Sequence, residues 1–155
     1  MMRLSDYLDD DLIINDLEVL NVAGALEAFG ALFEKRGHVP SGAEAVRALA
    51  AREESHTTCL GHGVAVPHAT VRGLPAPLLL VATARTPIQF GPPETDPVDL
   101  FFVLLSPPGR EGEHIKLLAR ICRLAQHPEE LEALRGASDD EGLLEAIRRV
   151  DSRHV

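Results

Sequence analysis

A histidine directly follows a proline in the stretch GHGVAVPHAT, residues 61–70. Pro67 fixes its own φ and lacks a backbone N–H, so the chain should leave the short apolar run VAV in a defined direction and present His68 at the end of that strand. Strand ends are where α/β sheets place their binding sites. A neutral imidazole can attack phosphorus without a separate base when an acceptor holds its other N–H. His68 is therefore a candidate phosphoryl acceptor.

The simpler interpretation of His68 is a loop histidine that is satisfied by local hydrogen bonds. Residue types nearby in the sequence favour an anion site instead. They comprise glycines that allow close approach of the backbone, hydroxyl groups, and a guanidinium fork near a helix end that suits phosphate. These residues are Gly61, Gly63, Thr57, Thr58 and Arg52.

Two other chemistries compete for the same loop. Cys59, His62 and His68, with His56 or His114 as a fourth ligand, are of the types that bind zinc. Their C-x2-H-x5-H spacing matches no familiar zinc template, so we expect no metal here. A nucleophilic role for Cys59 needs a base and an orienting partner, and the sequence assigns neither.

The hydrophobic pattern alternates between strands and helices. Strands are predicted at residues 12–19, 64–66, 77–84, 88–90 and 97–106. Helices are predicted at residues 22–36, 42–54, 113–126 and 128–135, and from 139 onward. Asn21, Ser41 and Ser138 are the expected N-caps of the first, second and last helices. The pattern predicts an α/β single-domain layered fold over residues 1–155, with a mixed β-sheet of about five strands flanked by helices on both faces.

Composition excludes several classes of protein. Of the 155 residues, 45% are hydrophobic and 25% are charged, and these proportions are typical of one globular domain. The net charge is −9. An acidic chain is a poor partner for nucleic acid or an anionic membrane. The sequence shows no apolar run long enough for membrane insertion and no secretion signal, so a cytoplasmic location is expected. The acidic run DYLDDDLIIND is expected to be a solvated face rather than a metal site.

Residues 51–69, AREESHTTCLGHGVAVPHA, resemble the signature of enzyme IIA of the fructose/mannitol class in the bacterial phosphoenolpyruvate:sugar phosphotransferase system, including its nitrogen-regulatory paralogue. The resemblance continues through TPIQF, DPVDLFFVLLSP and EHIKLLARICRLA. It implies that His68 receives the phosphoryl group and that Arg52 and His114 flank it. Without the resemblance, His114 is equally well explained as a residue on the first turn of its helix. Glu54 departs from the family pattern, which often has a lysine there.

The resemblance also implies the partners. The donor is the small carrier HPr or its nitrogen-type paralogue, and the step needs no cofactor because the energy comes with the phosphoramidate. The phosphoryl group then passes to an enzyme IIB, or it switches the docking of a regulated kinase, transporter or enzyme. The sequence leaves both outputs open.

Overall fold

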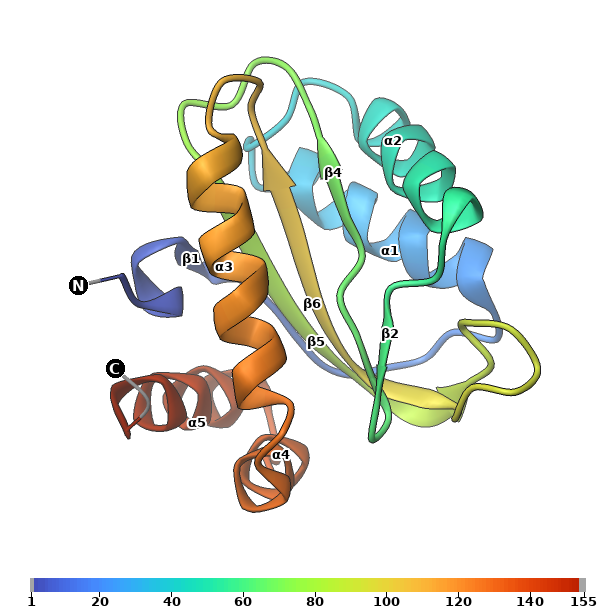
Figure 1. Cartoon of the computed structure of the whole chain (residues 1–155), viewed down its shortest axis with the longest axis vertical. Helices are drawn as coiled ribbons and strands as arrows, with labels where there is room; N and C mark the ends of the chain where they lie inside the picture. The colour runs from blue at the N-terminus through green and yellow to red at the C-terminus, as the bar shows by residue number, and fades with distance from the viewer. Residues whose placement is uncertain (1, 154–155) are drawn as a thin grey trace.

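The computed structural model describes residues 2–153, and a six-stranded mixed sheet lies at its centre (Figure 1). The strands are β1 (Leu8–Leu17), β2 (Cys59–Gly61), β3 (Val64–Ala65), β4 (His68–Thr70), β5 (Leu78–Ile88) and β6 (Val98–Ser106). Their order is β1-β5-β6-β3-β2, and β4 also pairs with β6. The β1–β5, β3–β6 and β4–β6 pairs are parallel, whereas β5–β6 and β2–β3 are antiparallel.

Helices cover both faces of this sheet (Figure 1). They are α1 (Val22–Lys35), α2 (Gly42–Ser55), α3 (Glu111–Leu124), α4 (Pro128–Arg135) and α5 (Asp140–Arg153), and a short 3-10 turn, η1 (Leu4–Asp6), precedes β1. Along β6, alternate side chains enter opposite cores, because successive residues of a strand point to opposite faces. Leu100, Phe102 and Leu104 pack with α3, α4 and α5, while Phe101, Val103 and Leu105 pack with α1 and α2. The predicted α/β layered fold is confirmed.

Local signals set most helix starts. Asn21 accepts a hydrogen bond from Gly24 N and caps α1, and Ser41 accepts one from Glu44 N and caps α2, as predicted. The prediction for α5 is wrong by one residue. Asp139 Oδ1, rather than Ser138, accepts a hydrogen bond from Gly142 N at 2.7 Å. Either side chain is a good cap, so composition alone does not decide between neighbours.

Helices α1 and α2 approach closely at a pair of glycines. A Cβ atom added at Gly30 would lie 2.7 Å from the carbonyl oxygen of Gly42, and one added at Gly42 would lie 2.6 Å from that of Gly30. Both distances are too short for any larger residue. The contact fixes α2, which carries Arg52, against α1.

Strands β3 and β4 form one line along the edge of β6. Val64 pairs with Leu100 and His68 with Leu104, so the register does not change between them. Pro67 interrupts the line because it has no N–H to donate, yet its carbonyl accepts a hydrogen bond from Leu104 N at 2.9 Å. His68 therefore begins β4, rather than ending the predicted strand at residues 64–66.

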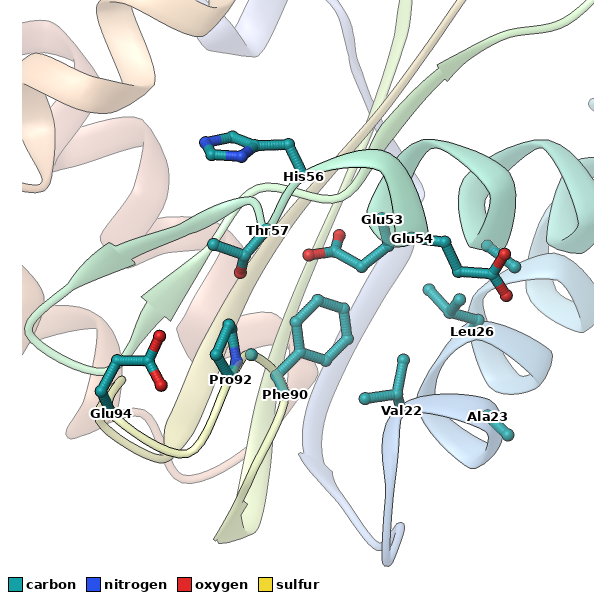
Figure 2. Close-up of a pocket in the computed structure, with 12 residues that line it drawn as sticks. Val22, Ala23, Leu26, Glu53, Glu54, His56, Thr57, Phe90, Pro92 and Glu94 are labelled. Atoms are coloured by element: carbon teal, nitrogen blue, oxygen red, sulfur yellow. The ribbon is translucent and has the colours of Figure 1, made fainter.

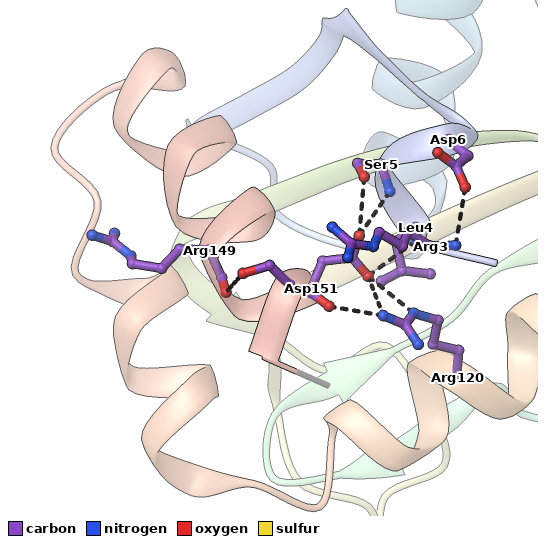
Figure 3. Close-up of polar contacts among 8 residues, drawn as sticks. Arg3, Leu4, Ser5, Asp6, Arg120, Arg149 and Asp151 are labelled. Carbon is purple, nitrogen blue, oxygen red and sulfur yellow. Dashed lines mark hydrogen bonds and ion pairs between the residues drawn. The ribbon is translucent and has the colours of Figure 1, made fainter. Parts of the chain in front are cut away.

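A buried ion pair ties α3, α5 and the N-terminal turn together (Figure 3). The carboxylate of Asp151 accepts hydrogen bonds from Arg120 Nε and Nη2 and from the backbone N–H groups of Leu4 and Ser5. Arg120 is 6% exposed and Asp151 is 1% exposed. The pair anchors α3, the helix that carries His114.

Strand boundaries differ more from prediction than helix boundaries. The predicted strands at 77–84 and 88–90 belong largely to one long strand, β5, and β1 begins four residues before the predicted start at residue 12. Among residues 2–153, no helix is long and apolar enough to cross a membrane.

Candidate functional site

The imidazole of His68 is held in one tautomer by the backbone. Its Nδ1 lies 2.8 Å from the carbonyl oxygen of Val66. A carbonyl oxygen can only accept, so Nδ1 carries the proton and donates it. Nε2 then keeps its lone pair, and this atom is the nucleophile that the neutral ring offers.

A second imidazole faces His68. The ring centroids of His68 and His114 lie 5.2 Å apart, with the ring planes inclined at 57°. His114 comes from the first turn of α3, and its Nδ1 shares a 2.6 Å hydrogen bond with Ser106 Oγ at the end of β6. The structure thus brings together two of the predicted residues from segments 46 positions apart.

The surroundings of both imidazoles favour the neutral form. Burial lowers the pKa of His68 below its ordinary 6.5, the charge of Arg52 lowers it further, and the Val66 hydrogen bond and Glu53 oppose this. Burial also lowers the pKa of His114, with contributions from His68 and Arg52 against that of Glu111. A nucleophilic nitrogen is therefore available near neutral pH.

Arg52 is the cation of this site. It lies near the C-terminal end of α2, and its charge acts on both imidazoles. Its Nη1 donates a 2.7 Å hydrogen bond to the carbonyl of His56, which leaves other N–H groups of the fork for an anion. Arg52, His68 and His114 together form what we call the histidine pair site.

The two predicted threonines have different surroundings. Thr58 is buried, and its hydroxyl donates to Glu53 Oε1 at 2.6 Å while its N–H donates to Glu53 Oε2 at 2.7 Å. Its hydroxyl proton is therefore used inside the protein. The Oγ1 of Thr57 accepts a hydrogen bond from Cys59 N, so its own proton remains available for a ligand.

The two predicted glycines lie away from the histidine pair site. Gly61, the last residue of β2, and Gly63, in the turn before β3, adopt φ values of 89° and 77°. The register along β6 separates this turn from His68 by four residues, roughly 13 Å of strand. Arg135 holds the turn by donating to the carbonyl of His62. The positive φ angles thus serve a tight hairpin turn.

Potential metal ligands gather elsewhere. Within the described part of the chain, the donor atoms of Asp9, Asp11 and His38 lie within 4.8 Å of one another. No such group among residues 2–153 contains Cys59, His62 or His68. His38 Nε2 lies within hydrogen-bond reach of both aspartates, which accounts for their approach.

An apolar side chain is exposed beside the site. Ile115 follows His114 on α3 and is 65% exposed. Single exposed aliphatic side chains are common on protein surfaces, so Ile115 is of interest through its place next to His114.

Sequence reasoning missed two groups that hold the imidazoles, the carbonyl of Val66 and the hydroxyl of Ser106. It also missed the carboxylate of Glu53, which binds Thr58 and acts on His68 through its charge. A serine at the end of an apolar strand is a usable signal for Ser106. The carbonyl of Val66 leaves no signal because every residue has one.

A family model and a curated relative match most of this chain. The model of the family described as "Phosphoenolpyruvate-dependent sugar phosphotransferase system, EIIA 2" matches residues 6–150. A "Nitrogen regulatory protein" from Bradyrhizobium diazoefficiens is 32% identical over 148 residues, which cover 94% of this chain and 95% of the relative.

Solved structures share the fold. The crystal structure of nitrogen regulatory protein IIA-Ntr from Neisseria meningitidis matches with a TM-score of 0.84 and 30% identity, covering 93% of this chain and 98% of the other. An Escherichia coli complex of mannitol enzyme IIA with phosphorylated mannitol enzyme IIB matches with a TM-score of 0.72 and 22% identity, covering 90% and 95%. This second likeness shows the fold alone.

Proposed function

The chain belongs to the EIIA 2 family of the phosphoenolpyruvate-dependent sugar phosphotransferase system, and we propose that it is a phosphoryl carrier whose His68 Nε2 accepts the phosphoryl group from a phosphohistidine of HPr or its nitrogen-type paralogue. The observation that carries the proposal is the hydrogen bond from His68 Nδ1 to the Val66 carbonyl. It leaves the lone pair of Nε2 as the nucleophile of the neutral ring.

The transfer balances without a separate base. The Nε2 lone pair of His68 forms the new N–P bond while the N–P bond of the donor breaks. The donor ring carries a proton on its other nitrogen, so it keeps the electron pair of the broken bond and leaves as a neutral imidazole. Positive charge develops on the His68 ring, and the Val66 carbonyl stabilises it through the Nδ1 proton. No proton needs to leave His68.

Arg52 and His114 supply electrostatics and positioning. A guanidinium fork holds two phosphoryl oxygens while charge moves between the two nitrogens, which is the main requirement of phosphoryl transfer. Ser106 fixes the ring of His114, so that its Nε2 side can face the phosphoryl group or His68. Ile115 provides an apolar contact for the carrier at the edge of the histidine pair site.

Labelling tests this function. The protein is incubated with phosphoenolpyruvate, enzyme I and HPr, and its intact mass is measured. We expect one added phosphoryl group that is lost in acid and survives alkali, as for a phosphoramidate. His68→Ala should remove it. Full labelling of the His68→Ala protein would refute the assignment.

The regulatory output is the better supported of the two. The relative at 32% identity and the solved structure at 30% identity both carry nitrogen-regulatory names. A phosphoryl group adds nearly two negative charges beside exposed Ile115, which is enough to change a protein contact. Phosphorylated protein mixed with purified enzyme IIB of the fructose and mannitol types should keep its label. Rapid loss of the label to either would favour sugar transport.

A further inference from the structure

A cavity borders the C-terminal end of α2, the helix that carries Arg52, and is not used by the transfer step. Its volume is about 710 Å³, and it is lined by α1, by the end of α2 and by the loop after β5. The floor is apolar and consists of Val22, Ala23, Leu26, Ala50, Phe90 and Pro92. Cavities of this size with an apolar floor and a few polar groups are typical of small-molecule sites.

The rim of this cavity is acidic. Glu53, Glu54 and Glu94 line it, and its described lining contains no lysine or arginine. Figure 2 shows Glu54 and Glu94 on opposite sides of the Phe90 ring, while the ring of His56 points away from the floor. Within residues 2–153, the side-chain carboxylates of Glu54 and Glu94 have no hydrogen-bond or ion-pair partner. An apolar body with a positive charge complements this lining, and an anion would be repelled.

One rim carboxylate is connected to the catalytic imidazole by hydrogen bonds. Glu53 accepts from the N–H and the hydroxyl of Thr58, and the Thr58 carbonyl accepts from Val66 N at 3.0 Å. The Val66 carbonyl then accepts from His68 Nδ1 at 2.8 Å. Glu53 thus borders the cavity and begins a continuous chain of contacts that ends on His68.

We propose that this cavity binds an organic ammonium ion with an apolar body, and that binding is coupled to the phosphorylation state of His68 through Glu53, Thr58 and Val66. The coupling rests on the proposed function, whereas the binding site does not. A cation at Glu53 is attracted by the added phosphoryl charge, so the phosphorylated protein binds it more tightly. By reciprocity, the ammonium ion favours the phosphorylated state by the same factor.

A titration with 4-phenylbutylammonium tests the site. Amide chemical shifts of the whole ¹⁵N-labelled chain are followed, with 4-phenylbutanoate as a probe of the same body and opposite charge. We expect saturable shifts at the cavity, at Leu26, Glu54 and Gly91, for the ammonium ion only. Equal binding of the carboxylate probe, or shifts confined to other surfaces, would overturn the site.

Variants separate charge at the rim from charge elsewhere. Removing two rim charges in the Glu54→Gln/Glu94→Gln protein should weaken ammonium binding about tenfold. Glu145→Gln is the matched control, because Glu145 is exposed on α5 and lies outside the cavity, and its affinity should equal that of the wild type. Wild-type affinity in the double variant would contradict the proposed role of the rim.

The coupling has its own readout. Protein phosphorylated on His68 should bind 4-phenylbutylammonium at least about twofold more tightly than unphosphorylated protein. Thr58→Val breaks the hydroxyl contact to Glu53 and should reduce this ratio. Equal affinities in the two states would refute the coupling. If His68 takes no label at all, the proposed function fails, while the titration of the unlabelled chain still decides the cavity.

Discussion

Replacing Asp151 by alanine should destabilise the protein, because it leaves the buried guanidinium of Arg120 without a counter-ion. The carboxylate accepts two hydrogen bonds from the guanidinium of Arg120 and one each from Leu4 N, Ser5 N and Ser5 Oγ. Asp151→Ala removes all five acceptor contacts and leaves a buried cation without its counter-ion. Such a loss is far more costly than the loss of a surface ion pair.

The size of the effect follows from these contacts. Breaking a buried pair by removing one partner costs about 3–5 kcal/mol. Arg120 Nη2 still donates to the backbone carbonyl of residue 151 at 2.8 Å, so we place the cost at the lower end, about 3 kcal/mol. In the Arg120→Met/Asp151→Ala protein the uncompensated charge is gone, and the orphaned N–H of Leu4 costs about 1–2 kcal/mol. The double variant should therefore be more stable than the single variant.

Urea unfolding at pH 7 measures both free energies of unfolding. Asp10→Ala is the control, because Asp10 pairs with Arg148 on the surface, and it should change stability by less than about 0.5 kcal/mol. A single variant within about 1 kcal/mol of the wild type, or a double variant less stable than the single one, would refute this reasoning.

The carboxylate of Asp151 should also make the free energy of unfolding depend on pH. Burial raises the pKa of Asp151, but the N–H of Ser5, the guanidinium of Arg120 and the N–H of Leu4 outweigh it and hold the pKa below its ordinary value. A depressed pKa contributes stability above the unfolded pKa of about 3.9, and this is lost as the pH falls through the folded pKa. The stability difference between wild type and Asp151→Asn should be constant from about pH 7 to 5 and shrink below about pH 4. A stability difference that stays constant down to pH 2 would contradict the lowered pKa of Asp151.

Three predictions concern the histidine pair site and are measured by transfer from phosphorylated HPr, with circular dichroism as the folding control. Arg52→Lys keeps the positive charge but loses the two-pronged guanidinium, so single-turnover transfer should slow by about tenfold or more. A wild-type rate would show that Arg52 has no role in transfer. His114→Ala should slow labelling of His68 by about 10- to 1,000-fold without abolishing it, and His114→Gln should recover part of the loss. A wild-type rate in His114→Ala would exclude a role for that ring. Ile115→Glu should raise the KM for phosphorylated HPr about tenfold with little change in kcat, and an unchanged KM would remove this side chain from the docking surface.

The sequence predicts the parts of the site that depend on neighbouring residues. The Pro67–His68 pair and the caps at Asn21 and Ser41 are local, and the structure has the capping contacts as expected. The residue type of Arg52 near a helix end makes it a candidate, whereas a role for His114 beside His68 depends on the family resemblance. Arg52 and His114 lie near His68 because α2 packs on β4 and α3 packs on β6. That proximity is a property of the tertiary fold.

The positions of three candidate residues, Gly61, Gly63 and Thr58, are set by turns of the backbone that the sequence pattern does not reveal. Gly61 and Gly63 are close to His68 in sequence, but the β2–β3 hairpin carries them away along β6. Thr58 lies beside Thr57, yet its hydroxyl is turned inward to Glu53 because the end of α2 brings that carboxylate over it. The side on which a hydroxyl points depends on backbone direction, which composition and spacing do not encode.

The most direct measurement identifies the nitrogen that carries the phosphoryl group. The chain is labelled with ¹⁵N-histidine, phosphorylated through enzyme I and HPr, and examined by long-range ¹H–¹⁵N correlation with phosphorus coupling. The Val66 hydrogen bond predicts that His68 Nε2 is bonded to phosphorus and that Nδ1 keeps its proton. Phosphorus on Nδ1 of His68, or on any other residue, would contradict the central claim.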